Sequence, residues 1–130
     1  MKTTAILILY AILAAGQPSS VRKPPLVGDG KMDNTAILNG ALVVPVVIFP
    51  PCGVYVFSNI VVKSDDVSII GRGACTIFKA LGDSAALFDA QGHANVKIQN
   101  LVFDLTAAPG STLAAGSATF TDVTITPAPK

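Results

Sequence analysis

A four-residue phrase recurs along the chain, and this repeat constrains the fold more than any other feature of the sequence. Each copy is an Asp or Asn followed by an apolar, a polar and an apolar residue. The three copies are Asp66-Val67-Ser68-Ile69, Asn95-Val96-Lys97-Ile98 and Asp122-Val123-Thr124-Ile125, which begin 29 and then 27 residues apart. Repeats of this length are typical of chains that stack one coil on the next, because a single coil cannot bury its apolar face alone.

Short β-branched runs separated by turn residues fill the chain after Pro45, as expected for strands. The runs lie at residues 46–49, 54–57, 60–62, 67–70, 76–78, 86–88, 96–98, 101–103 and 123–125. They predict an all-β solenoid with roughly three strands per coil and about three coils. The Val and Ile residues of the phrase would stack inward, and Ser68, Lys97 and Thr124 would form an outward column. A β-sandwich with turns every 8–12 residues is the competing architecture, and the repeat favours the solenoid.

One short helix is predicted before the strands. Asp33, Asn34 and Thr35 are all residues that favour a helix N-cap. The apolar residues that follow recur at helical spacing, and Pro45 ends the pattern. We therefore predict a helix over about 34–43.

The first 16 residues have the layout of a secretory signal peptide, with a basic start, an apolar run over 5–15 and small residues at its end. A transmembrane helix needs about 20 apolar residues, so we expect a secreted, extracellular protein without a stable membrane anchor. The proline-rich stretch 17–25 is typical of an extended arm. Residues 26–130 would then form a single solenoid domain.

The charge balance argues against a nucleic-acid partner. The leader contains one lysine, so the eight remaining basic residues match the eight acidic ones. A neutral chain lacks the basic field that attracts nucleic acid or an anionic membrane. All eight acidic residues are Asp, which favours turns, and this agrees with a turn-rich β protein.

The chain contains two cysteines, Cys52 and Cys75. An even number of cysteines in a secreted chain suggests a disulfide. In a coil-stacked fold, 23 residues make about one circuit, which would bring the two positions to adjacent strands roughly 4.8 Å apart, within the range that a disulfide bridges. The alternative is a pair of buried free thiols.

The order of several short motifs resembles the N-terminal part of the pectate-lyase-like superfamily, in particular its rhamnogalacturonase, epimerase and tailspike-type domains, with similar openings in polygalacturonases. The resemblance covers about residues 26–105. The motifs are Gly28-Asp29-Gly30, Asp33-Asn34-Thr35-Ala36-Ile37, Ala41-Leu42, Val47-Ile48-Phe49-Pro50-Pro51, Gly53-Val54-Tyr55 and Val67-Ser68-Ile69-Ile70-Gly71-Arg72-Gly73.

This resemblance implies a right-handed parallel β-helix whose N-terminal end is capped by the helix at 34–43. Members of the superfamily act on acidic or neutral polysaccharides, pectic ones among them, by lyase, hydrolase or epimerase chemistry. Others serve as phage tailspikes or surface adhesins. A polysaccharide is therefore the expected partner, and no cofactor is implied.

The sequence matches the family's catalytic motifs only in part. The polygalacturonase set resembles Asn-Thr-Asp, Asp-Asp, Gly-His-Gly and Arg-Ile-Lys, of which Asp65-Asp66 and Gly92-His93-Ala94 imitate the middle two. Asp65, Asp66 and His93 are thus the catalytic candidates, and ordinary turn residues are the alternative interpretation. Arg72 and Lys97 are candidates for binding a substrate, Arg72 through a sugar carboxylate. No His, Cys or Asp cluster has metal-ligand spacing.

The last coil begins near Asp122, and the sequence ends eight residues later. We expect either a piece of a longer protein that is incomplete at its C-terminus, a homo-oligomer that covers the open coil, or a terminal segment that folds back as a plug. Two functions remain open. One is a secreted carbohydrate-active protein of the polysaccharide lyase or glycoside hydrolase type, without its catalytic coils. The other is a non-catalytic structural or glycan-binding solenoid that self-associates through its open end.

Overall fold

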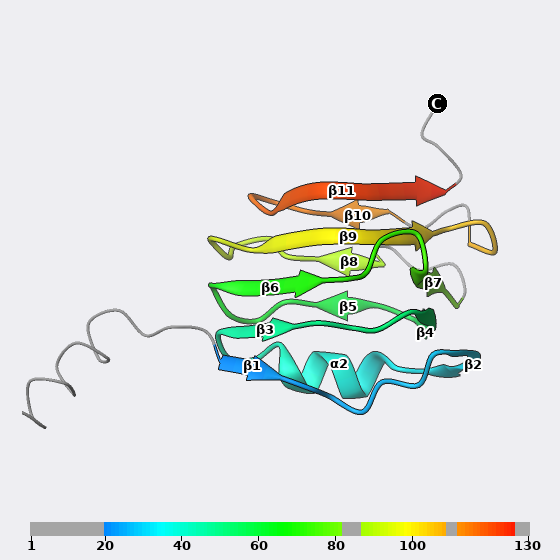
Figure 1. Ribbon diagram of the computed structural model, residues 1–130. Helices are drawn as coiled ribbons and strands as arrows, with labels where there is room; N and C mark the ends of the chain where they lie inside the picture. The colour runs from blue at the N-terminus through cyan, green and yellow to red at the C-terminus, as the bar shows by residue number, and fades with distance from the viewer. Residues whose placement is uncertain (1–19, 82–86, 109–111, 127–130) are drawn as a thin grey trace, which may run out of the picture.

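The computed structural model describes residues 20–81, 87–108 and 112–126, and in these ranges parallel strands stack into a solenoid of about four turns (Figure 1). Every strand pair there is parallel. This excludes the β-sandwich, whose sheets are antiparallel. The elements are β1 (Ser20–Arg22), β2 (Asp29–Asp33), α2 (Thr35–Ala41), β3 (Val46–Ile48), β4 (Gly53–Phe57), β5 (Ile60–Val61), β6 (Val67–Ile70), β7 (Thr76–Ala80), β8 (Phe88–Asp89), β9 (Lys97–Asp104), β10 (Leu113–Ala114) and β11 (Thr119–Thr126).

Three sides make up each coil. One coil consists of β3, β4 and β5, and the next consists of β6, β7 and β8. Strand β9 supplies two sides of the following coil, because its first half pairs with β6 and its second half pairs with β7. Strand β10 supplies the third side by pairing with β8, and β11 lies along the whole of β9. An eight-stranded sheet and a three-stranded sheet result.

The N-terminal end of the stack is formed by β1, β2 and α2. Strand β1 pairs with β3, β2 pairs with β4, and α2 lies where a third strand would be, at the bottom of the stack in Figure 1. The helix lies inside the predicted range 34–43, and Leu38 and Leu42 are fully buried in the hydrophobic core. The stack therefore contains about one turn more than the sequence patterns predicted, because residues of the proline-rich arm contribute β1.

Large apolar side chains fill the interior in columns. Ile48, Ile69 and Ile98 occupy equivalent positions on successive strands and are all buried. An aromatic column runs beside them, with ring centroids 6.0 Å apart for Tyr55 and Phe78 and 5.9 Å apart for Phe78 and Phe103. Each of these side chains packs against the coil before it and the coil after it. This burial of apolar surface between coils provides most of the hydrophobic stabilisation of such a fold.

The structure corrects the stacking predicted for the third copy of the repeated phrase. Ser68 pairs with Lys97 as predicted. The next residue in this outward column is Thr119, however, because Lys97 pairs with Thr119 while Thr124 pairs with Val102. The predicted column of Ser68, Lys97 and Thr124 is therefore wrong in its third member.

The same shift moves the inward residues of the third copy. Phe120 lies over Ile98, whereas Val123 and Ile125 pair with Leu101 and Phe103. The last coil advances 22 residues from Lys97 to Thr119, fewer than the 29 that separate Ser68 from Lys97 in the preceding coil. The phrase at residue 122 consequently begins the second side of its coil rather than the first.

The signal peptide predicted for residues 1–16 lies outside the described residues. Among the residues that the structure does describe, no helix has the length and apolar character that a membrane span requires.

Candidate functional site

The structure brings the three predicted catalytic residues to one corner of the solenoid, where β5 turns into β6 and β8 turns into β9. His93 Nδ1 lies 3.2 Å from Asp65 Oδ1, and the backbone N–H of Ala94 donates to the same oxygen at 2.9 Å. In the adjacent position, Asn95 Nδ2 donates to Asp66 Oδ1 at 2.7 Å. All of these bonds join one coil to the next.

Asp66 and Asn95 hold this corner through their backbone conformation. Their φ angles are 61° and 58°, in the left-handed region that Asp and Asn adopt more readily than other side-chain-bearing residues. The 29-residue spacing of these two residues in the sequence therefore marks the same turn in two successive coils. The structure thus confirms the repeat for its first two copies.

The electrostatics of the corner favour an ionised carboxylate. The pKa of Asp65 is lowered because the Ala94 N–H and the His93 ring both stabilise its negative charge. Asp65 is 58% exposed and His93 is 29% exposed, so the pair is accessible to solvent. The side chains of Asp65 and Asp66 nevertheless both form hydrogen bonds to the next coil. The evident role of this corner is therefore to hold neighbouring coils together. Hydrolysis of a glycosidic bond would instead require two carboxyl groups that face the substrate.

The two predicted substrate-binding residues lie at opposite ends of β6. Lys97 is exposed beside Ser68, at the end near Asp65 and His93. Arg72 follows the other end of the strand, in the turn that leads to β7. The structure therefore does not combine Arg72 and Lys97 into one site.

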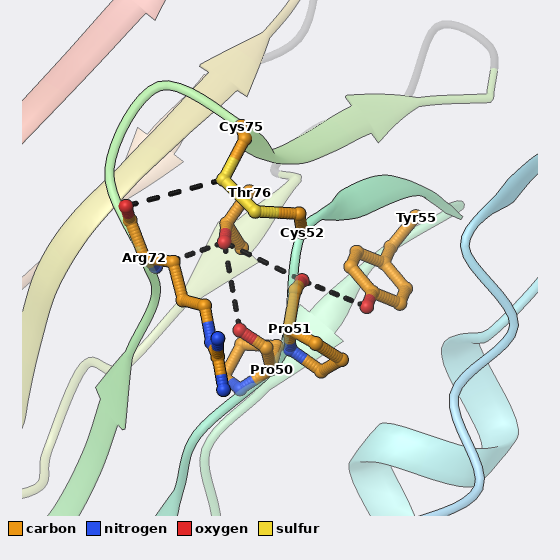
Figure 2. The surroundings of a disulfide bond; sticks show 7 residues. All are labelled: Pro50, Pro51, Cys52, Tyr55, Arg72, Cys75 and Thr76. Carbon is orange, nitrogen blue, oxygen red and sulfur yellow. Dashed lines mark hydrogen bonds between the residues drawn. A yellow bond between two sulfur atoms is a disulfide. The ribbon is translucent and has the colours of Figure 1, made fainter.

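Arg72 belongs to a corner that a disulfide closes (Figure 2). Cys52 and Cys75 are bonded, with Cα atoms 4.8 Å apart, which confirms the predicted bridge between turns of adjacent coils. Beside the bridge, the Gly53 N–H donates to the Cys75 carbonyl at 2.8 Å. A disulfide is compatible with an extracellular protein, because such bonds persist in oxidising compartments.

A buried hydroxyl positions Arg72 against the preceding coil. Thr76 is fully buried, and its Oγ1 accepts a hydrogen bond from the Arg72 N–H at 2.9 Å. The same hydroxyl lies 3.5 Å from the Pro50 carbonyl oxygen and 3.4 Å from that of Pro51. The Tyr55 hydroxyl also donates to the Pro51 carbonyl at 2.8 Å. Figure 2 shows the Arg72 side chain extending from this corner toward Pro50.

A hollow next to this corner was not predicted from the sequence. It has a volume of about 290 Å³ and lies between the N-terminal arm and the turn after β3. Basic, proline and apolar residues line it, namely Arg22, Lys23, Pro24, Pro25, Leu26, Ile48, Phe49, Pro50 and Pro51. A second hollow of about 300 Å³ shares Arg22, Lys23 and Pro24 and reaches Ala41.

The pairing of β1 with β3 creates this hollow. Because Arg22 is the register partner of Ile48, the residues Lys23-Pro24-Pro25 leave the sheet alongside Phe49-Pro50-Pro51. Two proline pairs thus face each other across a gap that neither can close by backbone hydrogen bonding, since proline has no N–H. The sequence contains a signal for this hollow, because Lys23 and Phe49 are each followed by a Pro-Pro pair. Only the strand register, however, shows that the two segments lie side by side.

The hollow combines an exposed aromatic ring with basic residues that have no acidic partner within the described part of the chain. Phe49 is 52% exposed. Among the described residues, the ion pair present is that of His93 with Asp65, and none joins Arg22, Lys23 or Arg72 to an acidic side chain. In the same ranges, no group of three or more His, Cys, Asp or Glu side chains is arranged to hold a metal ion.

Comparison of the chain with protein-family models, with curated proteins and with solved structures found no match.

Proposed function

We propose that this chain is a secreted, carbohydrate-active, right-handed β-helix of the pectate-lyase-like kind, and that its described part binds polysaccharide. The observation that carries the proposal is the hollow between the arm and the turn after β3, where an exposed phenyl ring and four prolines meet basic side chains that form no ion pair with any described acidic residue. Ligand sites commonly combine an apolar, aromatic wall with a few polar groups that orient the ligand.

The apolar wall suits the face of a sugar ring. Phe49 presents about half of its surface to solvent, and Pro50 and Pro51 continue the same wall. The C–H groups of a pyranose can pack on such rings without losing hydrogen bonds, because the hydroxyl groups project sideways. The wall is also rigid, since the disulfide and the Thr76 hydroxyl fix it to the next coil. A rigid wall reduces the entropy lost on binding.

A catalytic role is the second candidate, and one observation favours it. The structure brings Asp65 and His93 into contact, as an acid–base pair would require. If this pair removes a proton from a polysaccharide while the neighbouring glycosidic C–O bond breaks, the double bond that forms gives unsaturated ends that absorb in the ultraviolet, and His93→Ala should abolish them. If no unsaturated or reducing ends are released from a panel of polysaccharides, the catalytic role is refuted and polysaccharide binding remains the proposed function.

The binding function can be tested by expressing the full-length chain and purifying the secreted protein. Isothermal titration calorimetry against a panel of acidic and neutral polysaccharides should show binding to at least one of them. Phe49→Ala should weaken that binding about tenfold through loss of the ring face. The matched control is Leu81→Ala, because Leu81 is also 52% exposed but lies outside the hollow. Failure to bind every polysaccharide, or equal effects of the two substitutions, would refute the proposal.

A further inference from the structure

We infer that two copies of this chain associate head to head, with their β11 strands paired antiparallel about a twofold axis. The inference concerns assembly and does not depend on the proposed polysaccharide binding. Strand β11 lies at one end of the stack and α2 at the other (Figure 1). In the described part of the chain, β11 pairs with β9 alone, so no described strand lies along its other edge.

The first argument is the backbone of this free edge. The Thr119 N–H donates to a β9-side carbonyl, and the Thr126 carbonyl accepts from the chain just after β9, so both residues bond toward β9. Backbone groups of successive strand residues point to opposite edges, and the bend at Asp122 (φ 54°) separates the two halves of β11. The groups of Phe120 and Ile125 therefore point to the free edge. Natural edge strands often carry Lys or Pro that block pairing, and β11 has neither.

The second argument is the apolar surface at the same end of the stack. The inward residues of β11 pack on the core but are only partly buried, namely Phe120, Val123 and Ile125. Their register partners in β9 are buried, namely Ile98, Leu101 and Phe103. A further layer of apolar side chains above β11 would complete the burial, which favours association.

The third argument is that β11 is complementary to itself, which identifies a second copy as the partner. A twofold axis between Asp122 and Val123 sets like residues of the two copies opposite each other: Thr119 and Thr126, Phe120 and Ile125, Thr121 and Thr124. Inward apolar residues then meet inward apolar residues, and exposed threonines meet exposed threonines. The axis passes through the bend of β11, so it exchanges the two sides of the coil. The two pairs of Phe120 with Ile125 would exchange roughly four backbone hydrogen bonds.

The N-terminal end of the stack does not offer a matching surface. Ser20 and Arg22 of β1 are the register partners of the buried residues Val46 and Ile48, so a head-to-tail contact would place polar side chains over Phe120. Helix α2 also covers that end in place of a third strand. Association through β11 is therefore isologous and closes at two copies. It leaves the hollow of each copy at an outer end of the dimer.

Sedimentation velocity of the secreted full-length protein tests the inference. Between about 1 µM and about 200 µM the protein should change from monomer to dimer by mass action, without larger species. A monomer at every concentration would overturn the inference. A series of growing oligomers would also overturn it, because a twofold contact closes on itself whereas a head-to-tail contact does not.

Hydrogen exchange locates the contact. In the dilute monomer, the amides of β11 should exchange fast. At concentrations where the dimer forms, exchange at Phe120 and Ile125 should slow, while exchange in β1 should stay the same. If β11 is equally protected at every concentration, another part of the same chain covers it, and the inference is wrong.

Variants on the exposed side of β11 test the register. The double substitution Thr121→Lys and Thr124→Lys should raise the dissociation constant of the dimer at least tenfold, because each lysine would face a lysine of the second copy. Valine at the same two positions should preserve the dimer, since it is similar in shape and carries no charge. Thr106→Lys is the charge control, because Thr106 is an exposed threonine outside β11. Circular dichroism melting curves should show that all variants fold. A folded double-lysine variant that dimerises as tightly as the unmodified protein would overturn the inference.

Discussion

Asn34 shows at the scale of a single residue how the loop that follows the arm is held in place. It is fully buried, and its side-chain amide accepts from the Val27 N–H at 2.8 Å and donates to the carbonyls of Val27 and Met32 at 3.0 Å each. It occupies the N-cap position of α2 but makes no side-chain hydrogen bond to the helix. The sequence indicated a cap at Asp33, Asn34 and Thr35, and the amide instead bridges the loop that precedes it.

Asn34→Asp should destabilise the protein by about 2–4 kcal/mol. A carboxylate accepts hydrogen bonds but cannot donate to the two carbonyls, so buried polar groups would lose their partners. Gln91→Glu is the control, because it makes the same amide-to-acid change at an exposed position. Chemical denaturation measures both free energies of unfolding. A loss for Asn34→Asp no larger than that of the control would contradict this interpretation.

Asp65 should make the stability of the stacked coils depend on pH. Its folded pKa lies below the ordinary value of 3.8 because the Ala94 N–H and His93 stabilise the carboxylate. A depressed folded pKa contributes stability above the unfolded pKa, and that contribution is lost as the pH falls through the folded value. Asp65→Asn should therefore lower stability at pH 7 and reduce the further loss of stability below about pH 4.

Thermal unfolding followed from pH 7 to pH 2 checks this prediction. The unmodified protein should still lose stability in acid through other residues as well. Asp29, for example, also has a lowered pKa because the Met32 and Lys31 N–H groups bond to it. If the curves of Asp65→Asn and the unmodified protein run parallel below pH 4, the carboxylate of Asp65 does not act in this way.

At the scale of elements, Gly71 allows β6 to turn closely beneath β9. A Cβ at this position would collide with the Asn100 carbonyl oxygen and lie 2.9 Å from the Thr76 Cβ. The Gly71 N–H donates to the Gln99 carbonyl at 2.8 Å, so the two coils are hydrogen-bonded at this point. The glycine therefore sets how closely adjacent coils approach at the disulfide corner.

Gly71→Ala should cost about 2 kcal/mol or more, because the backbone of β9 would have to move. Gly40→Ala makes the same chemical change inside α2, where nothing lies within 4 Å of the added Cβ. That control should be stabilising by about 0.5–1 kcal/mol, as expected for alanine in a helix interior. The two free energies of unfolding should thus change in opposite directions, and a neutral Gly71→Ala would show that the corner is loosely packed.

The repeat and the cysteines allowed the stacking of coils and the disulfide to be predicted, because both depend on spacing along the chain. The equivalence of Asp66 and Asn95 and the bridge from Cys52 to Cys75 are confirmed. The position of Asp122 was misread, because a later coil is shorter and Asp122 occupies a different turn with the same backbone conformation (φ 54°). The hollow could not be predicted, since it depends on the register of a three-residue strand whose side chains are all exposed.

At the scale of the whole molecule, a solenoid is stabilised mainly by contacts between neighbouring coils, so its stability should vary along the stack. In the described part of the chain, β9 has paired strands on both sides, whereas β11 pairs with β9 alone. The inward residues reflect this difference, because Ile98 and Phe103 are fully buried while Phe120 and Ile125 are only partly buried. The disulfide adds a covalent link between the coils of β4 and β7.

Hydrogen exchange followed by mass spectrometry should therefore show a gradient of protection. Amides of β11 should exchange fastest among the long strands, and those of β7 and the second half of β9 should exchange slowest. Reduction with a dithiol should increase exchange mainly in β4 and β7, because opening the 23-residue closure restores conformational entropy worth roughly 3 kcal/mol to the unfolded chain. Uniform protection of β4, β7, β9 and β11 would instead mean that the coils unfold as a single cooperative unit. The bonds between coils at Asp65 and Cys52 would then stabilise the whole stack rather than the neighbouring coils alone.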